Sequence, residues 1–129
     1  MSKLIYFADD DKMILNLMEY TFSNRDGYIV KSFRKGEDVL VALNTEIPDL
    51  VVLDYNFFDN GSEMLTGLEV LKIIRKRSID IPVIMLSGQD DTALIPEFFK
   101  FGASKYIAKD SFFIDSLIES IQQVVAQQN

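Results

Sequence analysis

The sequence predicts an α/β fold: a doubly wound, five-stranded parallel sheet with helices on both faces. Two observations predict it. Short apolar runs alternate along the chain with longer amphipathic stretches, as in a series of β/α units. The runs "DLVVLD" and "IPVIML" are almost continuously apolar, which is typical of central strands covered on both faces.

The individual elements follow from this alternation in chain order. The predicted strands are Lys3–Ala8, Tyr28–Phe33, Asp49–Asp54, Ile81–Leu86 and Ser104–Ala108. The predicted helices are Asp10–Arg25, Gly36–Glu46, Thr66–Arg77, Asp91–Phe101 and Ser111–Gln127. Because Pro96 falls near the first turn of the fourth helix, where a missing N–H costs little, we expect that helix to be short or irregular at its start.

Apolar spacing gives two of these helices an inner face. In the first helix the expected inner residues are Met13, Ile14, Leu17 and Met18. In the third helix, "TGLEVLKIIRKR", they are Leu68, Val70, Leu71 and Ile74. The residues of the third helix that are expected to face water are Glu69, Lys72, Arg75 and Lys76.

Composition is that of one domain, residues 1–129, and it excludes several kinds of site. The chain is 48% hydrophobic and carries a net charge of −7, which argues against a basic nucleic-acid footprint. Cysteine and histidine are absent, so thiol and imidazole chemistry are excluded and any metal must be held by oxygen atoms. No signal-peptide pattern or membrane-length apolar run is visible, so we expect no membrane association and a cytoplasmic location.

Polar side chains stand at the C-terminal ends of four predicted strands, which meet at one edge of a parallel sheet. Asp9 and Asp10 follow the first strand, Asp54 ends the third, Ser87 follows the fourth and Lys109 follows the fifth. Any one of them alone is more often a helix cap, a turn residue or a solvated side chain. Together they supply carboxylates, a hydroxyl and an ammonium group, so we interpret them as one site.

The carboxylates of this set indicate a Mg²⁺ site. Asp9, Asp10 and Asp54 form a hard, all-oxygen pocket, and a divalent ion would offset their mutual repulsion. A carboxylate beside such an ion can act as a nucleophile toward phosphorus and form an aspartyl phosphate. Lys109, Ser87 and nearby backbone N–H groups could then neutralise the phosphoryl oxygens. The third carboxylate of "DDD", that of Asp11, is expected to face solvent in the first turn of the first helix, where the helix dipole favours it.

Five motifs stand in the order, and near the spacing, of a known family: "FADDDKMI", "PDLVVLDYN", "TGLEVLKIIRKR", "IPVIMLSGQDD" and "FGASKYIAKDS". Over essentially its whole length the chain resembles the receiver domain of bacterial two-component response regulators, of the single-domain chemotaxis type. The resemblance implies a flavodoxin-like sheet with strand order 2-1-3-4-5. It also implies a phosphorelay signalling protein rather than an enzyme, apart from self-catalysed phosphoryl transfer and slow autodephosphorylation.

The resemblance further implies a set of metal ligands and a phosphodonor. Asp54 would be phosphorylated by a partner histidine kinase or phosphotransfer protein, with Mg²⁺ as cofactor. Asp10 would bind the ion directly and Asp9 largely through water. The backbone carbonyl of Asn56 would complete the protein ligands together with Asp54.

A switch and an output surface are implied in the same way. Ser87 would be the switch hydroxyl, Lys109 would pair with the phosphate, and Tyr106 would be the aromatic residue whose ring turns inward. The fourth helix, fifth strand and fifth helix would then bind a downstream protein partner or a second copy of the chain. Since one helix face cannot bury all the aromatic rings of this stretch, we expect some to be exposed. These aromatic residues are Phe98, Phe99, Phe101, Tyr106, Phe112 and Phe113.

Two departures from the family pattern affect the predicted site. The loop "YNFFDNGSEML" lacks the family's proline. It is also longer than usual, because the glycine that ends it, Gly67, stands further from Asp54 than the corresponding glycine does in the family. Within this loop, Phe57 and Phe58 either pack onto the sheet edge or cover the site and slow loss of the phosphoryl group. Asp110 stands where the family has a cis proline. A cis bond before a non-proline residue costs about 2.5–4 kcal/mol, so we expect a trans bond and a different path for Lys109.

Two alternative functions stay open. A pseudo-receiver would keep the fold as an interaction module without phosphorylation, although the complete set of polar residues speaks against it. A magnesium-dependent phosphohydrolase would need a second acid two residues after its nucleophile, and that position is Asn56. The chain ends in "QQVVAQQN" without an output domain, so we do not expect it to bind nucleic acid itself.

Overall fold

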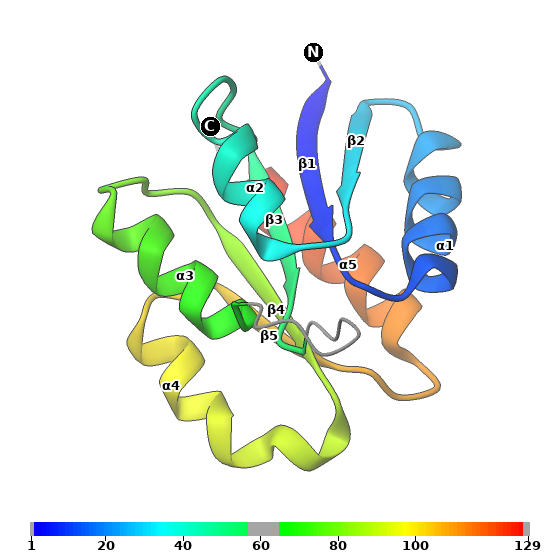
Figure 1. The fold of residues 1–129 in the computed structure, drawn as a ribbon. Coiled ribbons are helices and arrows are strands. Elements are labelled where there is room, and N and C mark those ends of the chain that lie inside the picture. The colour runs from blue at the N-terminus through cyan, green and yellow to red at the C-terminus, as the bar shows by residue number, and fades with distance from the viewer. Residues whose placement is uncertain (1, 57–64, 128–129) are drawn as a thin grey trace.

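The computed structural model describes residues 2–56 and 65–127 and confirms the doubly wound sheet (Figure 1). Its strands are β1 (Lys3–Ala8), β2 (Tyr28–Phe33), β3 (Leu50–Asp54), β4 (Val83–Ser87) and β5 (Lys105–Ala108). Its helices are α1 (Lys12–Ser23), α2 (Gly36–Ala42), α3 (Gly67–Lys76), α4 (Ile95–Lys100) and α5 (Phe113–Ala126), with a 3-10 helix, η1 (Gln89–Leu94), before α4. All neighbouring strands are parallel and their order is β2-β1-β3-β4-β5, as the sequence predicts.

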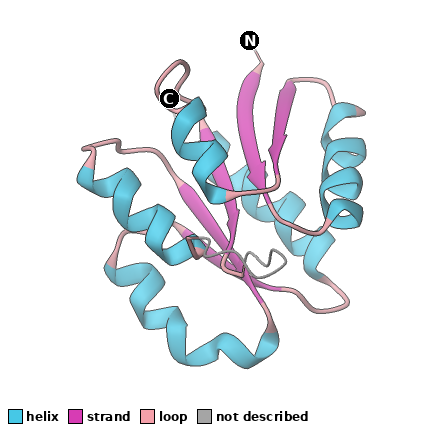
Figure 2. Ribbon diagram, in the orientation of Figure 1, coloured by secondary structure: helices cyan, strands magenta, loops and turns pink. Residues whose placement is uncertain are grey.

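The sheet lies between two layers of helices, as Figure 2 shows by secondary structure. Helices α1 and α5 cover one face, and α2, α3 and α4 cover the other (Figure 1). Successive side chains of β1 alternate between the layers, with Tyr6 and Ala8 packing toward α2–α4 and Ile5 and Phe7 packing toward α1 and α5. Every residue of β3 and β4 is buried, which explains why both strands appear in the sequence as continuous apolar runs.

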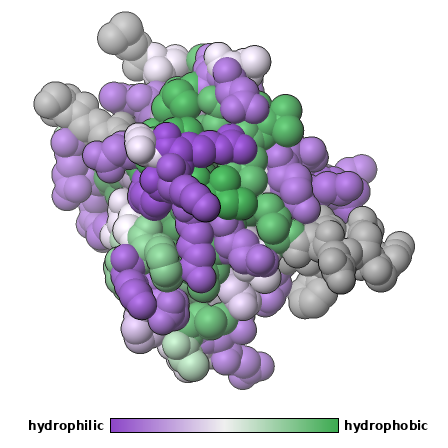
Figure 3. Space-filling view, turned by 60° about the vertical axis from the view of Figure 1, so that its left-hand side comes forward, coloured by the Kyte–Doolittle hydropathy of each residue, from purple (hydrophilic) through white to green (hydrophobic). Residues whose placement is uncertain are grey.

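Helix α3 has the inner face that its spacing predicts. Its buried residues include Leu68, Val70, Leu71 and Ile74. Thr66 and Glu69 form a capping box at its start, which satisfies two backbone donors of the first turn. Arg75 differs from the prediction, because it is half-buried and donates to the carbonyl oxygens of Ile79 and Gly102. Figure 3 shows the side of the molecule where α2 and α3 lie, and its surface is largely hydrophilic with smaller hydrophobic areas.

The predicted inner face of α1 is wrong in part. Met13 is 80% exposed and Leu17 is 44% exposed, whereas Leu15, Met18 and Phe22 are buried. The helix carries apolar residues along two adjacent stripes, and helical spacing alone does not say which stripe faces the sheet. Packing against β1 and β2 selects the stripe that contains Phe22.

The start of the fourth helix is irregular, as Pro96 indicates. The predicted helix is divided into η1 and the six-residue helix α4, with the proline in the first turn of α4. No helix within residues 2–56 and 65–127 has both the length and the apolar character needed to cross a membrane.

Candidate functional site

Hydrogen bonds that continue the sheet beyond its strands hold the site residues at one edge. The N–H of Asp9 donates to the carbonyl oxygen of Phe33 at 3.0 Å, just beyond β1. The N–H of Lys109 donates to the carbonyl oxygen of Ser87 at 2.9 Å, just beyond β5. Asp54, the last residue of β3, is paired with Leu86 of β4. The sheet register therefore brings together the residues that the sequence places at separate strand ends.

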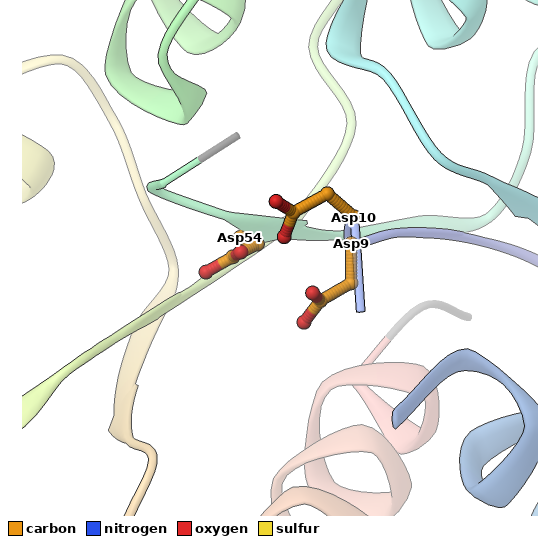
Figure 4. A group of neighbouring side chains, drawn as sticks. All are labelled: Asp9, Asp10 and Asp54. Carbon is orange, nitrogen blue, oxygen red and sulfur yellow. The ribbon is translucent and has the colours of Figure 1, made fainter. Parts of the chain in front are cut away.

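Three carboxylates gather at this edge (Figure 4). Asp9 and Asp10 lie next to each other at the end of β1, and Asp54 lies on the neighbouring strand. One carboxylate oxygen from each residue lies within 4.8 Å of the other two. Asp9 and Asp54 are almost completely buried, with exposed fractions of 0% and 2%, and Asp10 is half-buried. Buried carboxylates that lie this close repel each other strongly unless positive charge is nearby.

Lys109 brings positive charge directly to two of these carboxylates. Its Nζ lies 2.8 Å from Asp9 Oδ2 and 3.0 Å from Asp54 Oδ1, so a single ammonium group pairs with two buried carboxylates. The predicted trans bond before Asp110 is confirmed, since no peptide bond of the described chain is cis. Lys109 therefore reaches the carboxylates without the cis bond that the family usually has here.

The pKa values of this cluster reflect burial and like charge. Burial, with a further contribution from the charge of Asp9, raises the pKa of Asp54 to about 7, although Lys109 opposes the shift. Burial also raises the pKa of Asp9, against the stabilising contact with Lys109. Burial alone would lower the pKa of Lys109, but the charges of Asp54 and Asp9 outweigh it and the pKa is raised. Asp9 and Asp54 therefore hold more negative charge than the lysine they share neutralises, and an added cation would favour ionised Asp54.

The two predicted switch residues lie on the adjacent strands β4 and β5. Ser87 is fully buried at the end of β4, and its Oγ has no hydrogen-bond partner among the described residues. The Tyr106 ring on β5 stacks on Phe98, with centroids 5.9 Å apart, and its hydroxyl is also buried without a partner in that part of the chain. Phe98 in turn contacts the ring of Tyr55, the residue after Asp54. Aromatic contacts thus connect the end of β3 with β5 through α4.

Gly67 closes the long loop directly against the site. Its N–H donates to the carbonyl oxygen of Tyr55 at 2.8 Å, and a Cβ built on it would overlap the carbonyl oxygen of Asp54. A glycine is therefore required where the chain returns to the end of β3, even though the loop before it is long. The predicted alternatives for Phe57 and Phe58 lie outside the described residues.

Asp11 faces solvent as predicted, although it precedes the helix instead of lying in its first turn. It is the N-cap of α1, and its carboxylate accepts from the N–H groups of Met13 and Ile14. Its own N–H donates to Asp9 Oδ1 at 2.9 Å. Of the carboxylates in "DDD", this one caps the helix and does not join the cluster found at the sheet edge.

Sequence reasoning missed two residues at the rim of the site. Arg34, just after β2, donates to the carbonyl oxygen of Asp10 at 3.2 Å, a contact that depends on the pairing of β1 with β2 and leaves no sequence signal. Asp91 in η1 accepts from Asn56 Nδ2 at 3.2 Å and from the Gly88 N–H at 3.1 Å. The spacing of Gly88 and Asp91 is that of a helix cap and its third helical residue, which could have indicated the second contact.

Comparison with known sequences decides the family. The sequence model of the response regulator receiver domain matches residues 5–122. The chain belongs to this family. Receiver domains are signalling modules of two-component systems and are generally not classical enzymes.

Individual relatives show how far this likeness extends. The receiver domain is 34% identical over 109 residues to the alkaline phosphatase synthesis transcriptional regulatory protein PhoP of Bacillus subtilis. The aligned residues are 84% of this chain but 43% of PhoP, so the chain spans less than half of that relative. Among solved structures, the receiver domain of the Francisella response regulator 1452 is 31% identical, with a TM-score of 0.86 over 99% of this chain and 100% of that one. A BeF3-activated DrrB receiver domain is 28% identical, with a TM-score of 0.81 over 98% of this chain and 100% of that one.

Proposed function

We propose that this receiver domain accepts a phosphoryl group on the Asp54 carboxylate from a phosphohistidine of a partner kinase or phosphotransfer protein. One observation carries the proposal: Asp54 is buried at the end of β3, beside Asp9 and Asp10, with Lys109 Nζ 3.0 Å away. A carboxylate that only capped a turn would have no need of a half-buried lysine and two further carboxylates. Membership of a family that serves phosphorelay signalling supports the same reading.

In the proposed reaction a carboxylate oxygen of Asp54 attacks phosphorus. A P–O bond forms, the P–N bond to the donor histidine breaks, and that histidine leaves with the electron pair of the broken bond. Lys109 provides positive charge near the transferring oxygens, and Ser87 offers a buried hydroxyl as a hydrogen-bond donor. Positioning and charge neutralisation account for most of the catalysis in such transfers, so a buried, prearranged edge of the sheet suits the task.

The residues at this edge fit Mg²⁺. Carboxylate oxygens are its preferred protein ligands, and the three aspartates bring theirs within 4.8 Å of one another. Asp9 and Asp54 share one lysine, which leaves negative charge that a divalent ion would balance. Asp9, Asp10, Asp54 and the carbonyl oxygen of Asn56 would hold the ion. When bound there, it would supply positive charge to the phosphoryl group.

The surface of α4, β5 and α5 is the proposed output surface of this domain. Phe99 is 48% exposed and Phe112 is 71% exposed, so the predicted exposure of aromatic rings in this stretch is confirmed. We expect Ser87 to move toward the phosphoryl group, and Tyr106 to follow through its packing on Phe98, which changes the surface offered to a protein partner or a second copy. Amide chemical shifts with a beryllofluoride mimic test this, because shifts confined to residues around Asp54 would exclude this surface as the output.

Mass spectrometry of the intact protein tests the phosphorylation itself. After incubation with acetyl phosphate and Mg²⁺, the wild-type chain should gain the mass of one phosphoryl group, whereas Asp54→Asn should gain none. Excess EDTA should suppress labelling of the wild type. Labelling of Asp54→Asn, or undiminished labelling in EDTA, would contradict the proposal, and a wild-type chain that never gains mass would favour the pseudo-receiver.

A further inference from the structure

A single carboxylate oxygen joins two loops beside the proposed phosphorylation site. Asp91 Oδ2 accepts from the backbone N–H of Gly88 at 3.1 Å and from the side-chain Nδ2 of Asn56 at 3.2 Å. Gly88 directly follows Ser87 at the end of β4, and Asn56 lies two residues after Asp54 at the end of β3. The two donors therefore come from the segments that carry the proposed switch hydroxyl and the proposed phosphoacceptor.

Helix capping explains only one of these two contacts. A carboxylate at the third position of a helical turn commonly accepts from the backbone N–H of the cap residue, which accounts for the bond from Gly88. The bond from Asn56 comes from a residue 35 positions away and has no part in capping. Asp91 also departs from helical geometry inside η1, with φ −94° and ψ 20°. Its side chain thus joins the two loops that follow the paired strands β3 and β4.

These two donors are the kind that a phosphoryl group on Asp54 would need. Three anionic oxygens would enter next to Asn56 and Gly88, and N–H groups are good partners for such oxygens. In the structure both N–H groups are directed at another anion, the Asp91 carboxylate. A phosphoryl group and Asp91 would compete for them, and their like charges would repel.

We propose that Asp91 is a positioning residue that holds the loops after β3 and β4 in the unphosphorylated arrangement and opposes uptake of a phosphoryl group. The Asn56–Asp91 bond opens when Asp54 is phosphorylated, and the Asn56 amide and the Gly88 N–H become available to the phosphoryl oxygens. The inference rests on the proposed phosphorylation of Asp54 and concerns its regulation. Removal of the Asp91 carboxylate should therefore strengthen binding of a phosphoryl mimic.

The matched control for this test is the neighbouring aspartate. Asp90 is exposed in the same 3-10 helix, and its side chain makes no hydrogen bond or ion pair with the described residues. Asp90→Ala and Asp91→Ala remove the same charge from the same turn. We expect Asp91→Ala to bind beryllofluoride about threefold to tenfold more tightly than wild type, the range that one net hydrogen bond supports. Asp90→Ala should bind as wild type does.

Measurements on the full chain decide the inference. A titration with beryllofluoride in Mg²⁺, followed by amide chemical shifts, gives the affinity of each variant. Urea unfolding gives the stability of each variant. If Asp91 only capped η1, its removal would lower stability without tightening the binding of the mimic. A cycle with Asn56→Ala gives the coupling: the effect of Asp91→Ala should shrink when Asn56 is already truncated.

The outcomes separate this inference from the proposed function. Tighter binding by Asp91→Ala alone, with coupling to Asn56, supports the role of Asp91. Binding by Asp91→Ala that is equal to or weaker than wild type, or equal gains in both alanine variants, overturns it while Asp54 stays the phosphoacceptor. A wild-type chain that binds no mimic and gains no phosphoryl mass overturns both. Without any mimic, the NMR signals of the Asn56 side-chain amide should shift in Asp91→Ala and stay in place in Asp90→Ala. The reverse result would also overturn the inference.

Discussion

Replacement of Asp54 by asparagine should stabilise the metal-free protein. Asp54 is only 2% exposed, and burial is the main reason that its pKa is raised from 3.8 to about 7. In the unfolded chain the same group is hydrated and ionised above pH 4. Keeping it ionised in the folded protein therefore costs free energy that a neutral asparagine of the same shape does not incur.

The size of this effect follows from the pKa difference. A shift of about 3 units corresponds to about 4 kcal/mol at pH 8, which is the upper limit of the gain. The raised pKa already includes the attraction of Asp54 to Lys109, so loss of that ion pair does not reduce this figure further. The amide of the replacing asparagine does reduce it, because its buried N–H groups cost about 1–3 kcal/mol where they lack partners, so we expect the free energy of unfolding to rise by about 2 kcal/mol at pH 8.

The pH dependence has a definite sign. An acid whose folded pKa lies above its unfolded pKa keeps more protons in the folded state between the two values, so wild-type stability falls as pH rises from about 4 to about 7. Asp54→Asn should lose less stability over this range, although the raised pKa of Asp9 still contributes, and its advantage should vanish near pH 4.

Urea unfolding in EDTA, followed by circular dichroism at pH 4 and pH 8, measures both quantities. Asp11→Asn is the matched control, because it makes the same chemical change at the exposed N-cap of α1, where asparagine caps equally well. An Asp54→Asn variant that is less stable than wild type at pH 8, or that shows the wild-type pH slope, would refute the reasoning.

Three further predictions follow from the same geometry. Gly67→Ala should lower stability by about 1–3 kcal/mol in urea unfolding, since its Cβ would overlap the Asp54 carbonyl oxygen. Gly88→Ala, whose Cβ would have ordinary contact distances, should change stability by less than about 0.5 kcal/mol; equal effects would contradict the packing argument. Saturating Mg²⁺ at 100 times its dissociation constant should stabilise wild type by about 2.7 kcal/mol, and Asp10→Asn should lose most of this gain in a thermal melt. Phe98→Ala should cost about 3–5 kcal/mol, because the ring is completely buried; a loss under 1 kcal/mol would mean that the aromatic contacts repack.

The sequence predicted most of the fold because continuous apolar runs mark the strands of a buried parallel sheet. β1 and β2 have the predicted bounds, and the other strands differ by one or two residues at their ends. Strand ends in turn placed Asp9, Asp54 and Lys109 at one edge, since parallel strands present their carboxyl ends together. The local sequence pattern was sufficient for residues whose place in the fold is set by the end of a strand.

Sequence reasoning failed where a contact depends on packing between elements. The inner face of α1 was misplaced because Leu17 and Phe22 lie on two stripes of similar apolar character, and only contact with the sheet distinguishes them. The hydrogen bonds of Arg34 and Asp91 join residues 24 and 35 positions apart, so they depend on how strands and loops are placed in space. The need for a glycine at position 67 is likewise evident only in the structure, where the chain passes against the carbonyl oxygen of Asp54.

The measurement that tests the account most directly is to locate the phosphoryl group by reductive trapping. Borohydride converts an aspartyl phosphate to homoserine, and tandem mass spectrometry of peptides then identifies the modified residue. After treatment with acetyl phosphate and Mg²⁺, we predict homoserine at Asp54 and at no other aspartate. Homoserine at Asp9 or Asp10, or its absence throughout the chain, would contradict the assignment of Asp54 as the phosphoacceptor.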